Sequence, residues 1–407
     1  MKPMGTIPAE FQQAPLQIAG QTAEHWVKVA SDTPLFVYDF GVIAARVAQF
    51  RSAMPERVKL HYAIKANPFA SLLDAIAPLV DGLDVASGGE LGIALQRKPA
   101  AAISFAGPGK RDDELTAAIQ AGATINLESD GEWHRACALG DRLGIRPRVA
   151  VRVNPDFELR GSGMRMGGRA TPFGVDADRA APLIDSILAS DADWQGLHIF
   201  AGSQTLDGTA LIDALTGALA LAERLADQVG AIPPLTNLGG GFGIPYFPGE
   251  RAIDVTPIGQ ALGAALERSP LTGGFAIELG RWLVGESGVY LTRVVDRKES
   301  RGETFLVTDG GMNHQLAATG NLGTVVKRNY PVAVATAAPD AATETVSVVG
   351  PLCTPLDRLA DRVTLPVAQV GDLVAVFMAG AYGLTASPAA FLGHPAPREL
   401  LVGTPGG

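Results

Sequence analysis

The stretch LHYAIK, residues 60–65, sets the pattern on which the fold depends. It is a short run of strand-forming residues that leads to a polar side chain at its end. Seven more such runs follow along the chain. The polar or glycine positions that mark the ends of the eight runs are Lys65, Asp84, Ser104, Asn126, Arg152, His198, Gly239 and Glu278.

Helix-like segments separate these runs. They cover residues 69–80, 88–97, 112–121, 130–143, 176–190, 208–229 and 255–268. Eight strands that alternate with helices are typical of a (β/α)8 barrel. We therefore predict an α/β fold in which residues 41–282 form a TIM-type barrel.

The pattern changes after Arg281. Strand-like runs now follow one another without long helices between them, at residues 289–295, 303–307, 331–335, 345–349 and 373–377. They predict a second, mostly β domain over residues 283–407. The run PLFVYD, residues 34–39, is also strand-like. We expect the N-terminal segment 1–40 to contribute this strand to the β domain.

Composition excludes several classes of protein. The chain has 407 residues, a net charge of −9 and no basic run, which argues against nucleic acid as a partner. Its two cysteines exclude a disulfide framework and favour a reducing compartment such as the cytoplasm. The N-terminus lacks the apolar core of a signal peptide. Residues 374–393 carry no charge, but Gly380 and Pro388 interrupt them, so we predict no membrane span.

Lys65 is the first candidate for chemistry. Strand alternation places His61, Ala63 and Lys65 on one face, so Lys65 is predicted to point into the mouth of the barrel, where active sites of this fold lie. A lysine confined there loses hydration, and its amine suits Schiff-base chemistry. The alternative is an ordinary solvated lysine at a strand end.

Two other segments fit a site at the same end of the barrel. Glu278 is predicted to face inward, where a carboxylate needs a cation or a donor, and a structural salt bridge is the alternative. The turn NLGGGFG, residues 237–243, follows the seventh strand and offers backbone N–H groups that suit a phosphate. Ser203 could add a hydroxyl donor. The six histidines are scattered without HxH or HExxH spacing, so we predict no metal site.

Taken in order across residues 33–391, a set of motifs resembles one family. The motifs are HYAIKANP, DVASGGEL, RVNP, AGSQ, NLGGGFG, ELGR, GPLCTPLD and GAYG. The chain resembles the fold-type III pyridoxal-phosphate decarboxylases, which include the diaminopimelate, ornithine and arginine decarboxylases and share the fold of alanine racemase. Within that family it is most similar to the subgroup associated with exosortase and polysaccharide gene clusters, and to decarboxylases of carrier-bound amino acids.

The resemblance implies roles for individual residues. Lys65 would carry pyridoxal 5′-phosphate (PLP), Glu278 would pair with its pyridine nitrogen, and Cys353, from the neighbouring subunit of a homodimer, would return a proton to the reacting carbon. The alternative for Cys353 is an ordinary buried thiol. The residues that would hold the phosphate are Ser203, Gly239, Gly240, Gly241, Arg281 and Tyr382. Further polar positions around the cofactor are Asp84, Glu90 and Arg152.

One position near the cofactor departs from the family. Diaminopimelate decarboxylases carry a histidine three residues before the serine of the AGSQ segment, and here that position is Phe200. We expect Phe200 to stack on the cofactor ring and His198 to support it. A hydrogen-bonded core histidine is the alternative for His198.

The substrate side departs further. An arginine and a tyrosine of the diaminopimelate enzymes fall on Ala317 and Asn321, and the acidic residue after the catalytic cysteine is Thr354. We therefore predict that lysine, ornithine, arginine and meso-diaminopimelate are poor substrates. A carrier-bound amino acid, or a small neutral or acidic one, fits better. The candidates for the substrate pocket are Arg281, Asn313, His314, Arg328, Asp357 and Tyr382.

Three alternatives remain open at this point: a diaminopimelate decarboxylase proper, an amino-acid racemase of the same fold, and a non-catalytic PLP-binding homologue. A racemase needs a second base and usually pairs the pyridine nitrogen with arginine, so Glu278 and Cys353 favour decarboxylation. The intact lysine, acid, phosphate loop and cysteine argue against a non-catalytic protein.

Overall fold

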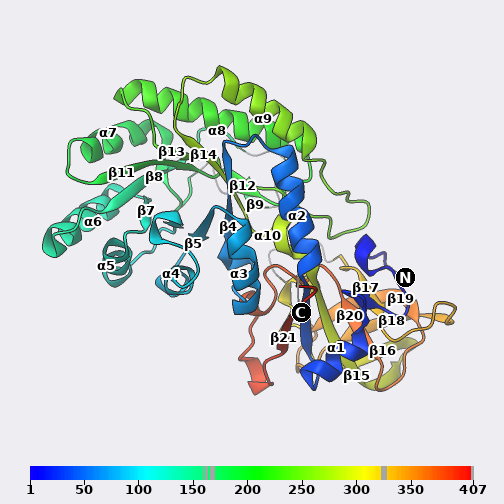
Figure 1. Ribbon diagram of the computed structural model, residues 1–407. Coiled ribbons are helices and arrows are strands. Elements are labelled where there is room, and N and C mark those ends of the chain that lie inside the picture. The colour runs from blue at the N-terminus through cyan, green and yellow to red at the C-terminus, as the bar shows by residue number, and fades with distance from the viewer. Residues whose placement is uncertain (159–160, 162–163, 166–169, 322–327, 405–407) are drawn as a thin grey trace.

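Eight parallel strands close into a barrel in the computed structural model, which describes residues 1–158, 161, 164–165, 170–321 and 328–404 (Figure 1). Pairing of β14 with β4 and of β7 with β8 completes the ring. The predicted (β/α)8 barrel is confirmed. Its strands are β4 (Val58–Ala63), β5 (Gly82–Val85), β6 (Ile103–Phe105), β7 (Thr124–Leu127), β8 (Arg148–Asn154), β11 (Asp193–Ile199), β13 (Leu235–Asn237) and β14 (Gly274–Leu279).

Helices surround the barrel (Figure 1). Each predicted segment forms one, and several begin where a polar side chain caps the first turn, as Ser87 does by accepting from the N–H of Glu90 at 3.2 Å. These helices are α3 (Ala70–Ile76), α4 (Gly88–Leu95), α5 (Asp112–Ala121), α6 (Asp130–Leu143), α7 (Ala177–Leu188), α8 (Gly208–Val229) and α9 (Thr256–Arg268).

Helix α2 (Phe40–Ala53) was not predicted. The Asp39 carboxylate accepts from the N–H of Gly41 at 2.8 Å and caps its first turn, so a signal for its start is present in the sequence. The smaller elements are β1 (Gln17–Ile18), β2 (Gln21–Thr22), α1 (Ala23–Ala30), β9 (Met164–Arg165), β10 (Val175–Asp176), β12 (Gly202–Ser203) and the short helix α10 (Arg281–Val284).

The second domain is built on one long sheet in the order β17–β20–β15–β16–β18–β19. Its strands are β15 (Gly288–Ser300), β16 (Glu303–Thr308), β17 (Val332–Val334), β18 (Thr343–Val349), β19 (Arg358–Pro366) and β20 (Leu373–Val376). From the start of the chain, β3 (Leu35–Asp39) pairs antiparallel with β15 and parallel with β21 (Arg398–Val402). The sequence did not predict β19 or β21, although buried Val363 and Leu365 alternate along β19.

The uncharged stretch 374–393 is buried in its first part, through Ala381, whereas Phe391 and Leu392 near its end are exposed. Strand β20 lies between β15 and β17, and the chain then forms a loop and two short 3-10 turns (Leu384–Ala386 and Phe391–Gly393). No helix within the described ranges is long and apolar enough to cross a bilayer.

Candidate active site

Lys65 lies in a single 3-10 turn, Ile64–Ala66, directly after β4. The sequence predicted that the strand continues through Lys65, but β4 ends at Ala63. A hydrogen bond between the residues that flank this turn stabilises it: the Tyr62 hydroxyl donates to the carbonyl of Asn67 at 2.9 Å. The Lys65 side chain is exposed. The predicted loss of hydration is therefore wrong for this chain taken by itself, since its own residues do not enclose the amine.

A loop of the β domain closes against the lysine turn. The N–H of Tyr382 donates to the carbonyl of Ala66 at 2.8 Å, and the Asn67 amide donates to the carbonyl of Gly380 at 3.0 Å. Tyr382 has a φ of 53°, an unusual value for a side chain of this size. Residues more than 300 positions apart are thus joined at the mouth of the barrel.

Glu278 and His198 form a buried pair in the barrel. His198 Nε2 lies 3.0 Å from Glu278 Oε2, close enough for an ion pair when the ring is protonated. Asn237 donates its amide to the same oxygen at 3.2 Å. Burial raises the pKa of Glu278, but His198, with Lys65 and Arg152, outweighs burial and lowers the pKa to about 2. Glu278 is therefore an anion at neutral pH.

The glycine turn after β13 is shaped by close packing. Gly239 has a φ of 77°, and a Cβ on Gly240 would lie 2.0 Å from the carbonyl oxygen of Glu278. The N–H of Gly239 is already used, because it donates to Asn237 Oδ1 at 2.9 Å. Within the described part of the chain, the N–H groups of Gly240 and Gly241 have no hydrogen-bond acceptor. Two of the three predicted glycines therefore offer a free donor.

Arg281 follows the last barrel strand and faces two tyrosines. Its Nη1 donates to the Tyr246 hydroxyl at 2.8 Å, and its guanidinium carbon lies 4.6 Å from the centre of the Tyr382 ring. The buried Nε of Arg281 has no partner among the described residues. Ser203 lies in β12, shortly after β11. Tyr246 was not predicted as a site residue, although its place three residues after the NLGGGFG turn is a usable signal.

Asp84 and Arg152 are both buried and already have partners. Asp84 Oδ1 lies 3.3 Å from His61 Nδ1, whereas no described residue contacts Asp84 Oδ2 by a hydrogen bond. Arg152 donates to Glu128 at 2.8 Å. Glu128 also accepts from the N–H of Gly174 at 2.8 Å, so it ties Arg152 to the loop before α7. His61 and Glu128 were not predicted as part of this region.

Phe200 and Glu90 lie at the rim. Phe200 follows directly after β11 and is half-buried, with its ring beside Gly239, since a Cβ there would lie 3.2 Å from a Phe200 ring carbon. Glu90 accepts from the N–H of Ala86 at 2.7 Å. Burial raises the pKa of Glu90, and the positive charge of Lys65 opposes this effect. Glu90 and Lys65 are therefore close enough to interact electrostatically.

Cys353 is exposed in the loop between β18 and β19. Asp357, in the same loop, is buried. Its two oxygens accept from the N–H groups of Met312 at 2.6 Å and Leu352 at 2.9 Å. Burial raises the pKa of Asp357 against these two hydrogen bonds. Asp357 therefore joins the loop that contains Met312 to its own loop, and both of its oxygens accept backbone hydrogen bonds.

Asn313 and His314 are fully buried. His314 Nδ1 lies 3.0 Å from the Tyr290 hydroxyl, and its Nε2 lies 3.0 Å from the carbonyl of Pro395. Burial lowers the pKa of His314 to about 4. Because neither side chain has exposed surface, the substrate-contacting role predicted for them receives no support. Arg328 lies against the segment that follows the glycine turn: its guanidinium is 3.8 Å over the Phe247 ring, and its Nη1 donates to Glu250 at 3.2 Å.

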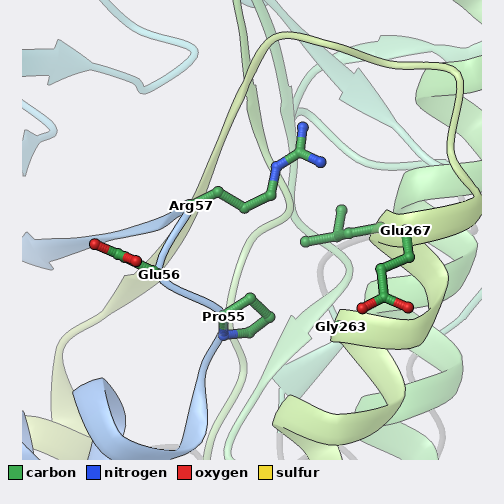
Figure 2. Close-up of a pocket in the computed structure, with 6 residues that line it drawn as sticks. Pro55, Glu56, Arg57, Gly263 and Glu267 are labelled. Carbon is green, nitrogen blue, oxygen red and sulfur yellow. The ribbon is translucent and has the colours of Figure 1, made fainter.

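A separate hollow of about 470 Å³ lies at the opposite end of the barrel (Figure 2). Its lining includes Pro55, Glu56 and Arg57, which precede β4, and Glu267 on α9. Lys65 follows β4, so the hollow and the lysine are at different ends of that strand. Arg57 already donates to the carbonyls of Leu271 and Gly273. The hollow is not part of the candidate site.

Comparison with known proteins gives this geometry a context. The family model described as "Pyridoxal-dependent decarboxylase, pyridoxal binding domain" matches residues 40–285. The chain belongs to the pyridoxal-dependent decarboxylases. The predicted family, the reaction class and the cofactor are confirmed, and the racemase and non-catalytic alternatives are not supported.

Relatives of this decarboxylase span nearly its whole length. The L-glutamyl-[BtrI acyl-carrier protein] decarboxylase of Niallia circulans is 36% identical over 381 residues, 91% of this chain and 89% of that protein. The diaminopimelate decarboxylase of Aquifex aeolicus is 29% identical, covering 93% and 88% of the two chains. The solved diaminopimelate decarboxylase of M. jannaschii has a TM-score of 0.86 at 26% identity, covering 98% and 92%.

The residues present fit PLP. The cofactor is a flat ring with a basic nitrogen, an aldehyde and a phosphate. The decarboxylase provides a buried carboxylate at Glu278, an exposed amine at Lys65 and several donors without acceptors among the described residues. These donors are the N–H groups of Gly240 and Gly241 and the Nε of Arg281. Unsatisfied buried donors are costly, and a bound phosphate would satisfy them.

Proposed function

We propose that this decarboxylase acts on an amino acid tethered to a carrier protein, with an L-glutamyl group as the first candidate. The observation that carries the proposal is that neutral residues, Ala317, Asn321 and Thr354, stand at the positions where the diaminopimelate enzymes carry an arginine, a tyrosine and an acidic residue. Asn321 there donates to the carbonyl of Leu356 at 3.2 Å, and Thr354 accepts from the N–H of Leu356 at 3.3 Å. Thr354 thus bonds within its own loop, and Asn321 bonds across to that loop. The likeness to the glutamyl-carrier decarboxylase supports the same substrate class.

The Glu278 carboxylate is the charged group on which the proposed reaction depends most, and the chain orients it by its own contacts. Bound PLP would supply an electron sink for the decarboxylation. Glu278, an anion at neutral pH, would keep the pyridine nitrogen protonated, and His198 and Asn237 hold that carboxylate in place. Asp84 and Arg152 would complete the polar surroundings of the ring. Phe200 would stack on the pyridine ring of PLP. His198 would then support Glu278 instead of stacking on the ring.

The chain also offers a set of residues that would hold the phosphate of PLP. Ser203, Gly239, Gly240, Gly241, Arg281 and Tyr382 are the residues we assign to it. Lys65 would carry the cofactor, and its exposed position lets a substrate amine reach it. The hydrogen bond from Tyr382 to Ala66 couples the phosphate side to the lysine turn.

Cys353 would donate the final proton to Cα from a second copy of the chain. The thiol is exposed, as a group that serves another subunit must be. Asp357 buttresses its loop through the two backbone hydrogen bonds described above. We therefore propose a homodimer with shared sites.

Cys137 and Cys353 are both unpaired, which supports a reducing compartment, and we propose the cytoplasm.

The test is a decarboxylation screen of the PLP-loaded enzyme. Free L-glutamate, glutamyl-carrier protein, meso-diaminopimelate, lysine, ornithine and arginine are each incubated with it, and loss of CO2 is followed by mass spectrometry. We expect turnover of the carrier-bound group and little of the four dibasic amino acids. Comparable or faster turnover of meso-diaminopimelate would refute the proposal.

A further inference from the structure

Arg281 is held from two sides. On one side its Nη1 donates to the Tyr246 hydroxyl at 2.8 Å, and on the other its guanidinium lies 4.6 Å from the ring centre of Tyr382. Tyr246 is the one hydrogen-bond acceptor that the described residues offer to this guanidinium. An arginine side chain has many rotamers, so this hydrogen bond decides where the charge lies.

Tyr246 is itself rigidly placed. Its ring packs on Tyr330 with 4.8 Å between centroids, and both rings are almost fully buried. Its N–H donates to Glu250 Oε2 at 3.0 Å. At its carbonyl the chain start comes so close that a Cβ on Gly5 would lie 2.1 Å from the oxygen. Little freedom remains for this tyrosine.

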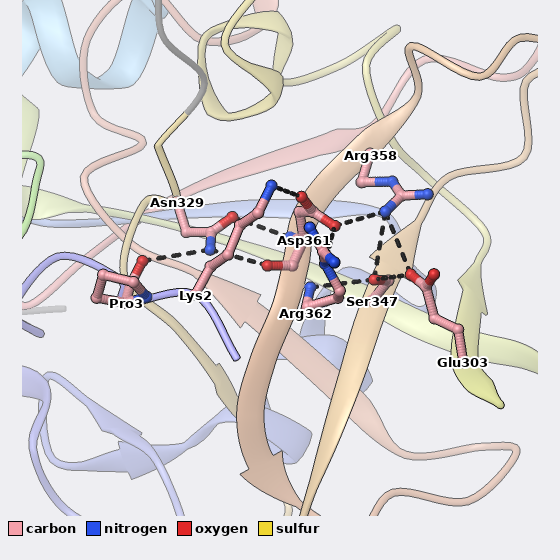
Figure 3. A network of polar contacts seen from close by, with 8 residues as sticks. All are labelled: Lys2, Pro3, Glu303, Asn329, Ser347, Arg358, Asp361 and Arg362. Atoms are coloured by element: carbon pink, nitrogen blue, oxygen red, sulfur yellow. Dashed lines mark hydrogen bonds and ion pairs between the residues drawn. The ribbon is translucent and has the colours of Figure 1, made fainter.

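The support extends to the N-terminus. Figure 3 shows Asn329, the neighbour of Tyr330, hydrogen-bonded through its side chain to the carbonyls of Pro3 at 3.3 Å and Asp361 at 3.1 Å. Lys2 in turn forms an ion pair with Asp361. The first residues of the chain and β19 thus fix the segment that carries Tyr330, and Tyr330 fixes Tyr246.

The hydroxyl of Tyr246 is suited to this task. Burial raises its pKa, and the nearby Arg281 opposes that effect only in part, so the group stays protonated. It accepts from Arg281 through oxygen and adds no negative charge that would repel a phosphate. The Arg281 Nε, which has no partner among the residues described, remains free for an anion.

We propose that Tyr246 is a positioning residue that holds the Arg281 guanidinium toward the phosphate of PLP. The inference rests on the assignment of Arg281 to the phosphate made above. It gives a role to Tyr246 that is exerted through its hydrogen bond with Arg281.

The experiment compares two deletions of a single hydroxyl, Tyr246→Phe and Tyr330→Phe. The Tyr330 hydroxyl forms no hydrogen bond with the described residues, so the second variant controls for loss of the oxygen atom alone. Apoenzymes are titrated by absorbance with PLP and with pyridoxal, which lacks the phosphate. Thermal unfolding verifies that each variant folds.

We expect Tyr246→Phe to raise the Kd for PLP about tenfold and to leave the Kd for pyridoxal unchanged. Tyr330→Phe should change neither. Equal weakening for PLP and pyridoxal, or no change for PLP, would overturn the proposal. Arg281→Gln separates the phosphate-binding role of Arg281 from the positioning role of Tyr246. If Arg281→Gln weakens PLP binding while Tyr246→Phe does not, only the positioning role fails. If neither variant weakens PLP binding, the phosphate assignment of Arg281 fails as well.

Discussion

His198 Nε2 lies 3.0 Å from Glu278 Oε2, although the two residues come from strands that are not neighbours. Strand β13 runs between β11 and β14, and its Asn237 contacts the same Glu278 carboxylate. Three adjacent strands therefore contribute one side chain each to a single buried anion. The carboxylate is oriented before any cofactor binds, which avoids reorganisation during the reaction.

The first prediction concerns the charge of Glu278. Glu278→Gln keeps the volume of the side chain and removes its negative charge, so we expect the kcat for decarboxylation to fall about 100-fold or more. PLP content, measured by absorbance, should fall much less than kcat. Glu303→Gln in the β domain serves as a control and should retain normal activity. Near-normal kcat in Glu278→Gln would exclude Glu278 as the partner of the pyridine nitrogen.

The second prediction concerns stability in mild acid. Burial lowers the pKa of His314 from 6.5 to about 4, so the unfolded chain binds a proton there more readily than the folded one. The contribution of His314 to stability is complete above pH 6.5 and is lost as the pH falls toward 4. His314→Gln should flatten the dependence of the unfolding free energy on pH within this window. An unchanged slope would contradict the assignment, whatever the absolute stability of the variant.

The third prediction uses a pair of glycines. A Cβ on Gly240 would lie 2.0 Å from the carbonyl of Glu278, whereas one on Gly92 in α4 meets nothing within 4 Å. Gly240→Ala should destabilise the protein by about 1–3 kcal/mol and lower its affinity for PLP. Gly92→Ala should be neutral or slightly stabilising, since alanine favours helix. The measurements are denaturant unfolding and PLP titration, and equal effects of the two changes would count against the tight packing.

The fourth prediction identifies the residue that carries PLP. Borohydride treatment of the PLP-saturated enzyme, followed by digestion, should add a pyridoxyl group to the peptide that contains Lys65. Lys59 lies in the same β4 region and should remain unmodified, which makes it an internal control. Absence of the added mass on the Lys65 peptide would remove the basis of the proposed site.

The fifth prediction tests shared sites. Lys65→Ala and Cys353→Ala should each abolish most activity, because one removes the cofactor attachment and the other the proton donor. After subunit exchange between the two variants, a heterodimer would regain one complete site, and activity should return to a fraction of that of the wild type. If exchange is demonstrated by mass spectrometry and activity does not return, each subunit contains its whole site.

Much of the architecture could be predicted because it depends on local patterns. Short apolar runs that end in polar residues, separated by amphipathic segments, repeat eight times and leave few folds other than a barrel. The missed strands β19 and β21 are exposed in part and contain charged residues, which weakens the same pattern. Prediction failed where burial is set by distant segments, as for His314, which Tyr290 and Pro395 enclose.

By itself, the sequence determined the barrel, the family and the chemical types at its mouth, because spacing and residue type are properties of the chain read in order. Only the tertiary structure decided which groups meet. The contact of His198 with Glu278, the hydrogen bond from Tyr382 to Ala66 and the hold of Tyr246 on Arg281 depend on strand register and on the docking of the β domain. Such contacts join residues tens to hundreds of positions apart, and local preferences do not encode them.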